Sequence, residues 1–448
     1  MLPVPLPLAA LALLAGPAAA LSAHEASFSL DTPSEVVAHV TASCGGCDWG
    51  GRGHEAAALD LRLDGHYSQH LFLTRGSEAA EYRVALGRLG AGSHRLSLGL
   101  DRKRSGRLVR GASVEGVVFR PAPPGTAGER LLAHAPVLEA RPNTLGHFSD
   151  VPLVLWVETE ALDGGGTRLR YSVVFSNEDG GTPPDRLMAT WGRLTDLEYV
   201  YGVDLDPSGR VIGEQYQGPK HVLLPFAGRH EAEHPVLYVV TDNNMVSDRG
   251  KRTVRFAPAP VAFDLSSTSR EALMDANPWT YAVSVREVRR EGRVDERARP
   301  GSDKLPDPRR FATLEACAAT RDATIAFSIG VRGPDGSTRW HDSDAGLPRF
   351  RIGRRATEFP NGCFRGAVAL PAGIAPADIV GLRTRAFTRI AGKDEPPLPR
   401  GAGSARLERV NTLFLLGEDD QPTPSLFSWR GAVDLAPEGS AFELPIRD

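Results

Sequence analysis

Two carboxylates stand two residues apart in a segment that alternates like a β-strand. Asp196 and Glu198 open this segment, and Tyr199, Tyr201 and Val203 continue it. Residues i and i+2 of a strand share a face and lie about 6.6 Å apart, a spacing that suits a catalytic acid and base or a pair of metal ligands. The sequence therefore offers Asp196 and Glu198 as catalytic residues. The plainer alternative is a strand face covered by water, since charged side chains are mostly exposed.

A second candidate is the string HEAEH at residues 230–234, which has the HExxH pattern. On a helix, two histidines at i and i+4 bind zinc and the glutamate activates water. Pro235 follows at once, however, and proline disfavours helical conformation at the residue before it. In an extended chain the two histidines are about 13 Å apart. The sequence therefore favours a polar loop that leads into an apolar strand at residues 236–241.

Three segments in the middle of the chain occur in an order that is also found in a known protein family. They are an acidic strand at residues 195–200, a Gln-His segment at residues 217–221 and a His-Pro-x-x-Tyr strand that begins at His234. In this order, residues 195–240 resemble the fungal vacuolar protein sorting domain with a Gly-Asp-Trp-Glu-His signature, although the Trp and His of the signature are replaced here. The resemblance implies no particular activity. It implies that Asp196, Glu198, His221 and His234 gather in one place.

Such a gathering would make His221 and His234 metal ligands. The identity of the cofactor stays open, and a divalent metal, zinc or calcium, is the group that these side chains would hold. Other signatures of chemistry are missing from the sequence, which contains no Gly-x-Ser-x-Gly nucleophile elbow and no phosphate-binding GxxxxGK[ST] loop.

One tryptophan is a candidate for ligand contact. Trp340 is followed by His341 and Asp342 in a polar stretch after a predicted hairpin turn at residues 334–336. Aromatic faces stack on sugar rings, but aromatic side chains also dominate buried area, so a place in the core is the alternative.

The beginning of the chain predicts its compartment. An apolar run at residues 6–20, rich in Leu and Ala, ends in small residues, and we interpret residues 1–23 as a signal peptide. Cleavage after Ala20 and cleavage after Ala23 fit equally well. The run is shorter than the roughly 20 residues of a membrane-spanning helix, and no later run is long enough. The sequence thus predicts a secreted or periplasmic protein with no membrane span in the mature chain.

Cysteine number and net charge agree with that compartment. In an oxidising compartment the even set of four cysteines predicts disulfides, and Cys317 is available to Cys363. Cys44-Gly-Gly-Cys47 fits a local disulfide, a redox pair or half of a zinc site, and the compartment favours the disulfide. The formal net charge is only −3, so no nucleic acid or membrane surface is indicated as a partner.

Alternating apolar residues between Gly-rich turns predict a mostly β chain with several β-sandwich-like domains and few short helices. Segments rich in Pro and Gly or Ala divide the chain. The predicted domains are residues 24–120, a β-sandwich; residues 127–262, a β-rich middle domain; and residues 263–448, a β-sandwich-like C-terminal domain. Helices are predicted at residues 183–190 and 266–275, and a strand at residues 279–288.

These patterns favour a secreted protein that binds carbohydrate or cell-envelope material, or that has a structural role, without catalysis. The alternative is a secreted hydrolase, with or without a metal, whose site lies in the middle domain. Fold alone does not decide between them, and both functions stay open at this point.

Overall fold

The computed structural model describes residues 23–178, 180–353, 362–392 and 395–446. The predicted signal peptide lies outside these residues, apart from Ala23. The described chain is mostly β, with several separate sheets and short helices, which confirms the predicted fold class. In the part of the chain that the structure describes, no helix is both long and apolar enough to cross a membrane.

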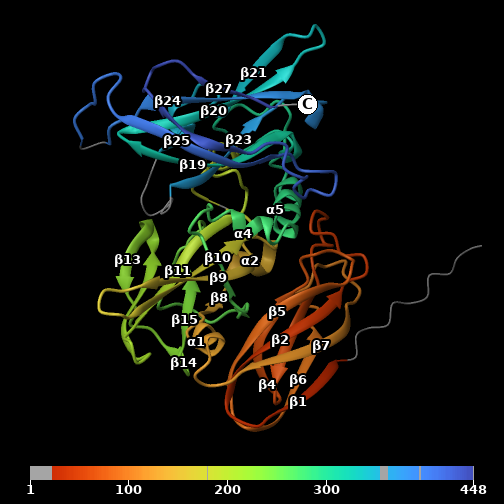
Figure 1. Cartoon of the computed structure of the whole chain (residues 1–448). Helices are drawn as coiled ribbons and strands as arrows, with labels where there is room; N and C mark the ends of the chain where they lie inside the picture. The colour runs from red at the N-terminus through yellow and green to blue at the C-terminus, as the bar shows by residue number, and fades with distance from the viewer. Residues whose placement is uncertain (1–22, 179, 354–361, 393–394, 447–448) are drawn as a thin grey trace, which may run out of the picture.

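The first seven strands form a β-sandwich (Figure 1). One sheet has the order β1-β6-β3-β4 and the other the order β5-β2-β7. Leu59 and Leu61 point into the core between the sheets while Arg62 is exposed, as the alternation predicts. The strands are β1 (His24–Leu30), β2 (Ser34–Ser43), β3 (Ala58–Leu63), β4 (His66–Phe72), β5 (Ala80–Leu89), β6 (Gly92–Leu100) and β7 (Ser113–Ala122).

The middle of the chain contributes two sheets that pack face to face. The larger has the order β13-β12-β11-β10-β9-β18, and the smaller has the order β14-β15-β8-β17 with β16 beside β15. The strands are β8 (Val137–Glu139), β9 (Pro152–Ala161), β10 (Thr167–Phe175), β11 (Asp196–Leu205), β12 (Val211–Gly218), β13 (Val222–Pro225), β14 (His230–Glu231), β15 (His234–Val239), β16 (Val246–Ser247), β17 (Arg255–Phe256) and β18 (Val261–Ala262).

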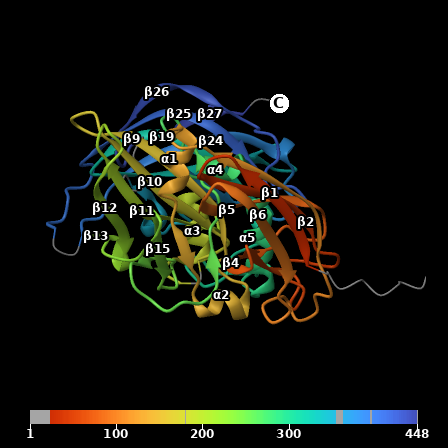
Figure 2. The same cartoon turned by 90° about the horizontal axis from the view of Figure 1, so that it is seen from below.

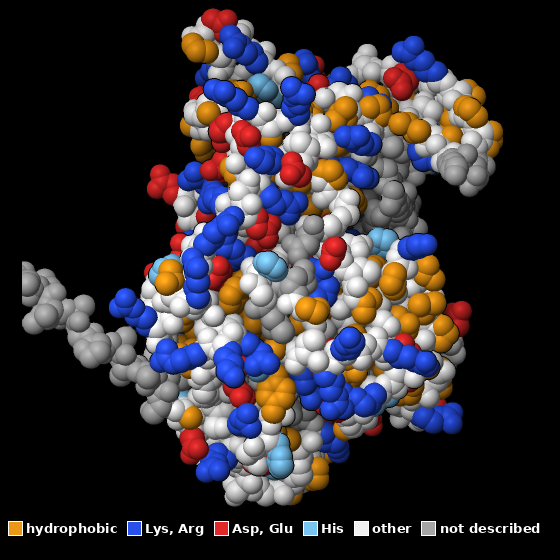
Figure 3. Space-filling model, turned by 180° about the vertical axis from the view of Figure 1, so that it is seen from behind, with side chains coloured by type: hydrophobic (Ala, Val, Ile, Leu, Met, Phe, Trp, Pro, Cys, Tyr) orange, Lys and Arg blue, Asp and Glu red, His pale blue; other side chains and the backbone are white. Residues whose placement is uncertain are grey.

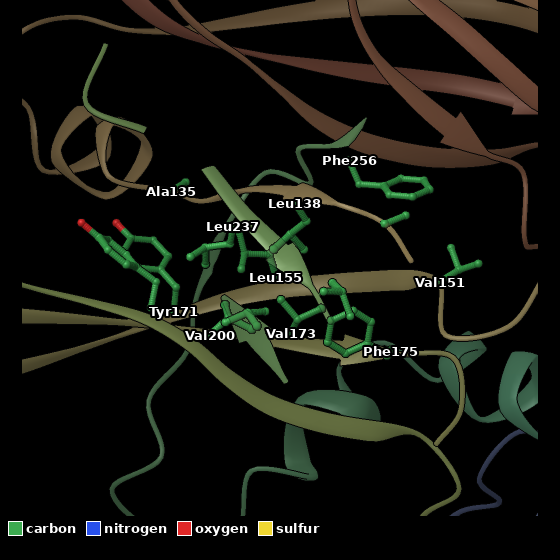
Figure 4. Close-up of a cluster of buried hydrophobic side chains, with 14 of the residues drawn as sticks. Ala135, Leu138, Val151, Leu155, Tyr171, Val173, Phe175, Val200, Leu237 and Phe256 are labelled. Carbon is green, nitrogen blue, oxygen red and sulfur yellow. The ribbon is translucent and has the colours of Figure 1, made fainter. Parts of the chain in front are cut away.

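The core between these two sheets is apolar (Figure 4). Leu155, Val173 and Val200 come from the larger sheet, and Leu138 and Leu237 come from the smaller one. The pairing of β10 with β11 shifts by one residue between Tyr171 and Ser172, so that Val200 is an extra residue of β11. Such a bulge changes which face the following residues occupy. Val200 and Tyr201 therefore both face the same core.

Five α-helices are described: α1 (Ala127–Ala133), α2 (Pro142–His147), α3 (Pro184–Trp191), α4 (Ala272–Asp275) and α5 (Trp279–Arg290). Single 3-10 turns are η1 (Pro219–His221), η2 (Pro308–Arg310), η3 (Pro348–Phe350) and η4 (Pro376–Asp378). The helix predicted at residues 183–190 is confirmed as α3. Of the helix predicted at residues 266–275, only the last four residues are helical.

The strand predicted at residues 279–288 is wrong, because this segment is helix α5. Its alternating Tyr and Val residues look like a strand, but Tyr281, Val285 and Val288 lie three to four residues apart and share one helical face. That face packs on the larger middle sheet and on the C-terminal sheets. Pro278 directly before the helix fits its first turn, where no backbone donor is needed.

The last third of the chain forms another sandwich. Its sheets have the orders β23-β19-β25-β26 and β21-β20-β24-β27, with β22 beside β20. The strands are β19 (Phe311–Arg321), β20 (Ala323–Arg332), β21 (Thr338–Asp342), β22 (Ile352–Gly353), β23 (Cys363–Ala369), β24 (Ile379–Thr388), β25 (Ser404–Phe414), β26 (Trp429–Leu435) and β27 (Phe442–Pro445).

Both predicted disulfides are present. Cys44 is bonded to Cys47, and Cys317 to Cys363, which lies opposite it on the neighbouring strand.

Helix α5 is the element that all three parts of the molecule contact. It lies between the middle sheets and the C-terminal sandwich, while the N-terminal sandwich stands beside the middle sheets (Figures 1 and 2). Trp49, in a loop of the N-terminal sandwich, donates from Nε1 to Oε2 of Glu287 on α5 at 2.9 Å. The buried face of α5 and the beginning of β11 belong to one continuous core.

Candidate functional site

Three buried carboxyl groups gather at the beginning of β11. Asp196 and Glu198 share a face of the strand, as their spacing predicts, but they are only 1% and 8% exposed. The alternative of a water-covered strand face is therefore wrong. The two side chains form a hydrogen bond with each other. The third carboxyl group is that of Glu178, which follows strand β10 and is also buried.

Burial sets the protonation of this cluster. It raises the pKa of the Glu198 carboxyl well above its usual range, and the neighbouring charge of Asp196 raises it further. Burial, together with the charge of Asp196, raises the pKa of Glu178 to about 8. Burial also raises the pKa of Asp196. Because three adjacent buried carboxyl groups cannot all ionise, the cluster retains protons at neutral pH.

Side-chain amides from two other segments donate to the cluster. Asn244 donates from Nδ2 to Asp196 Oδ2 at 3.0 Å and to Asp150 Oδ1 at 3.1 Å. It lies in the turn between β15 and β16 with φ +55°, a conformation that asparagine tolerates better than most residues. Gln217 on β12 donates from Nε2 to Glu198 Oε2 at 2.7 Å. A strand and a turn that are distant from β11 in the sequence thus supply the donors.

Two arginines supply the positive charge near the cluster. The charges of Arg193 and Arg270 lower the pKa values of Asp196 and Glu198, although burial outweighs them. Arg193 is itself buried, and its Nε lies 3.2 Å from Oε1 of Glu271. The ion pair with Glu271 holds the Arg193 guanidinium in place.

The surface above Glu198 is formed by Gln217 and His221. His221 Nδ1 lies 4.0 Å from Glu198 Oε2 and 3.4 Å from Gln217 Nε2. The His221 side chain is 60% exposed, so this is the side on which the cluster lies nearest to solvent. Asp196, Glu198 and His221, three of the four residues whose gathering the resemblance implied, thus lie together.

His234 lies elsewhere. Its ring is buried, with Nδ1 2.9 Å from the carbonyl oxygen of Ala135 and Nε2 3.2 Å from Oε2 of Glu35 in the N-terminal sandwich. It begins β15, whereas Asn244 follows the other end of that six-residue strand, a length of about 20 Å. The structure therefore does not join His234 to His221 as a pair of metal ligands. His234 connects two parts of the fold.

The HExxH string forms a hairpin. His230 and Glu231 are strand β14, Ala232 has φ +54°, and Glu231 is paired with His234 on β15. This confirms the predicted non-helical segment that leads into an apolar strand. Among the described residues, no three or more His, Cys, Asp or Glu side chains are arranged to hold a metal ion.

Trp340 lies flat against its own sheet. On β21 it faces Gly330 of β20, and a side chain at Gly330 or at the neighbouring Gly381 would touch its ring at about 3 Å. The guanidinium carbon of Arg383 lies 3.6 Å from the ring centroid. The neighbouring strands and Arg383 thus already cover much of the ring that was predicted to contact a ligand.

Glu178, Asn244 and Arg193 were not among the residues singled out from the sequence. Each lies in a turn or just beyond a helix or strand, where polar residues ordinarily face water. The one available signal was the polar run at residues 176–181, directly after the apolar strand β10. Neither a protein-family model nor a curated protein matches this chain.

Proposed function

We propose that this chain is an exported hydrolase in which Asp196 and Glu198 act as acid and base. The observation that carries the proposal is the hydrogen-bonded, buried carboxyl pair, with the pKa of Glu198 raised well above its usual range. Strongly perturbed carboxyl groups cluster at functional sites. Export is supported by the apolar first 20 residues and by two disulfides, which persist in oxidising compartments.

A carboxyl pair that shares one proton can supply both the general base and the general acid of a hydrolysis. The ionised member takes a proton from water, and the water hydroxyl attacks the substrate carbon. The protonated member gives its proton to the leaving group, so that water is added across the bond. Gln217 donates to Glu198 and thereby orients it.

The contact between the two carboxyl groups favours acyl bonds, either ester or amide, as substrates. Glycosidases hold their carboxyl pair about 5–9.5 Å apart, because a sugar carbon or a water must fit between the two groups. Two carboxyl groups that share a proton are the arrangement with which aspartic proteases activate water. Substrate would approach from the exposed side of His221.

The test is a hydrolysis assay on the purified mature chain with p-nitrophenyl esters, fluorescent casein and p-nitrophenyl glycosides. Glu198→Gln and Asp196→Asn should each lower the rate at least about 100-fold, since a general acid or base contributes 10²–10⁴. Asp204→Asn is the matched control, because Asp204 lies on the same strand but pairs with Arg168 at 2.6 Å.

Equal rates of hydrolysis in Glu198→Gln and in the native chain would contradict the proposed role of Glu198 as acid or base. Cleavage of glycosides alone would contradict the acyl class, and no turnover of any of these substrates would contradict the hydrolase itself.

A further inference from the structure

A pocket of about 680 Å³ opens where the N-terminal sandwich meets helices α2 and α5. Its volume lies in the range of small-ligand sites and is far larger than a single inorganic anion needs. The cationic residues of its wall are Arg52, Lys103 and Arg107 from two loops of the sandwich and Arg290 from the end of α5. Phe148, directly after α2, is the aromatic side chain of the wall.

The positive charges of this pocket exceed its negative charges. Glu291 and Glu55 are the two acidic residues in the wall. Glu291 already pairs with Arg293 at 3.5 Å, and Glu55 accepts from the backbone N–H of Gly53 at 2.8 Å. Within the described residues, no carboxylate forms an ion pair with Lys103 or Arg107. These two cations are therefore available to a ligand.

Arg290 is fixed in place by neutral partners. It is 7% exposed and donates to the carbonyl oxygens of Trp49 at 2.7 Å, Phe148 at 2.7 Å and His147 at 3.3 Å. Carbonyl oxygens orient a guanidinium without cancelling its charge. The charge of Arg290 lowers the pKa of the buried Glu287 carboxyl, but burial outweighs it and raises that pKa to about 7, so Glu287 is only partly ionised near neutral pH.

The loops that carry the other cations are held against each other. The N–H of Leu108 donates to the carbonyl oxygen of Gly53 at 2.7 Å, and Arg52 Nε donates to the carbonyl oxygen of Arg290 at 3.1 Å. Gly53 has φ +85°, and a side chain there would meet Arg107 Cγ at 3.0 Å. The absence of a side chain at Gly53 thus leaves space for the Arg107 side chain to pack over this residue. Arg290 and Arg52 are held by hydrogen bonds to backbone carbonyl oxygens, whereas Lys103 and Arg107 are exposed side chains carried by the packed loops.

We propose that this pocket binds an acidic oligosaccharide, a ligand rich in hydroxyl groups with two or more carboxylate or sulfate groups. Several separated cations call for several anionic groups, and Arg and Lys recognise carboxylate and sulfate by charge-assisted hydrogen bonds. A wall made mostly of polar and charged residues suits sugar hydroxyls better than an acyl chain. The face seen in Figure 3 is also rich in Lys and Arg over its lower half, which would attract such a ligand.

The pocket adjoins the carboxyl cluster but is a separate site. Glu291 of its wall accepts from Asn177 Nδ2 at 3.1 Å, and the carbonyl oxygen of Asn177 accepts from Asn244 Nδ2 at 3.3 Å. The inference does not depend on the proposed hydrolase, because none of its cations belongs to the carboxyl pair.

Isothermal titration calorimetry on the full mature chain tests the inference with three probes: trigalacturonate, uncharged maltotriose and inorganic phosphate. We expect trigalacturonate to bind at least tenfold more tightly than maltotriose or phosphate. Its affinity should fall when the salt concentration rises from 50 to 200 mM, as the affinity of electrostatic binding does. The double variant Lys103→Gln/Arg107→Gln should lose at least tenfold in affinity. Arg95→Gln, which removes an exposed arginine of the same sandwich, is the control and should bind normally.

Four results would overturn the inference. They are no binding of trigalacturonate, binding of maltotriose with equal affinity, full affinity in the double variant, or phosphate binding as tight as that of trigalacturonate, which would make the pocket a simple anion site. Glu198→Gln should leave the affinity for trigalacturonate unchanged, so failure of the hydrolase proposal and failure of this inference are distinguishable.

Discussion

Gln217 donates from Nε2 to Glu198 Oε2 at 2.7 Å and so links strand β12 to the buried acid on β11. On the other side, Asn244 donates to Asp196. The two amides hold the carboxyl pair from opposite ends, and His221 lies over the end nearer to solvent. Burial and the charge of Asp196 are the main causes of the raised pKa of Glu198, and Gln217 adds a hydrogen bond to this carboxyl.

Replacing Gln217 by Leu should raise the pKa of Glu198 further. An amide that donates to a carboxylate stabilises the ionised form, so its loss favours the protonated form. The measurement is a pH titration of the glutamate side-chain carboxyl signals by carbon NMR, with Glu198→Gln used for assignment. Gln215→Leu is the control, because Gln215 lies on the same strand but donates to Tyr199 at 3.3 Å. A Glu198 titration that is unchanged in Gln217→Leu would contradict this role.

Glu178→Gln should make the stability of the protein less dependent on pH. The folded state raises the pKa of Glu178 to about 8, above the usual 4.5. Its favourable contribution is therefore complete below pH 4.5 and is lost as the pH rises through 8. At pH 9 the variant, which stays neutral, should be more stable than the native chain by about 1–3 kcal/mol.

Urea unfolding at pH 5, 7 and 9 measures this difference. Glu160→Gln, an exposed partner of Arg170, should follow the native chain at each pH. Parallel pH profiles of Glu178→Gln and the native chain would show that Glu178 ionises without cost in the fold.

Arg365→Met should destabilise the contact between α4 and the C-terminal sandwich. Arg365 is fully buried, with Nε 3.2 Å from Glu315 Oε2 and a second ion pair to Asp275 at the end of α4. Its removal leaves the carboxylate of Glu315 buried without this cation, which costs about 3–5 kcal/mol. Arg406→Met, which breaks an exposed pair with Asp434, should cost less than about 1 kcal/mol. Equal urea midpoints for the two variants would refute the difference.

Replacing Cys317 and Cys363 together by Ser should lower the free energy of unfolding by about 4 kcal/mol. The bond closes a loop with a sequence separation of 46 residues, and the chain-entropy model relates that length to this cost. Comparison of urea unfolding for the double variant and for the native chain treated with a reductant checks the figure. A loss below about 1 kcal/mol in both would show that the paired strands need no cross-link.

Trp340→Ala tests whether this tryptophan packs or binds. The ring covers Gly330 and Gly381, so its loss exposes two glycine backbones and should lower the melting temperature by several degrees. Glycan-array binding should stay the same if the ring only packs. Lost glycan binding at unchanged stability would restore the predicted ligand contact.

Local patterns predicted much of the fold correctly. The alternation of Leu59 and Leu61 is that of strand β3, and the hairpin turn predicted at residues 334–336 lies between β20 and β21. The failure at residues 279–288 has a physical cause. Tyr281, Val283 and Val285 alternate with small residues as in a strand, and contacts with distant segments bury Glu287 and Arg290, so the charged residues do not mark one exposed face.

The sequence by itself determined the secondary structure of most strands and the common face of Asp196 and Glu198, because each depends on spacing along one segment, and it predicted disulfides without deciding which cysteines pair. Only the tertiary structure decided that the two carboxylates are buried, that Glu178 and Asn244 join them, and that His234 does not. It also decided where the pocket cations lie. Burial and charge neighbours depend on contacts between residues 19 to 238 positions apart in the sequence, and a single sequence contains no local signal for them.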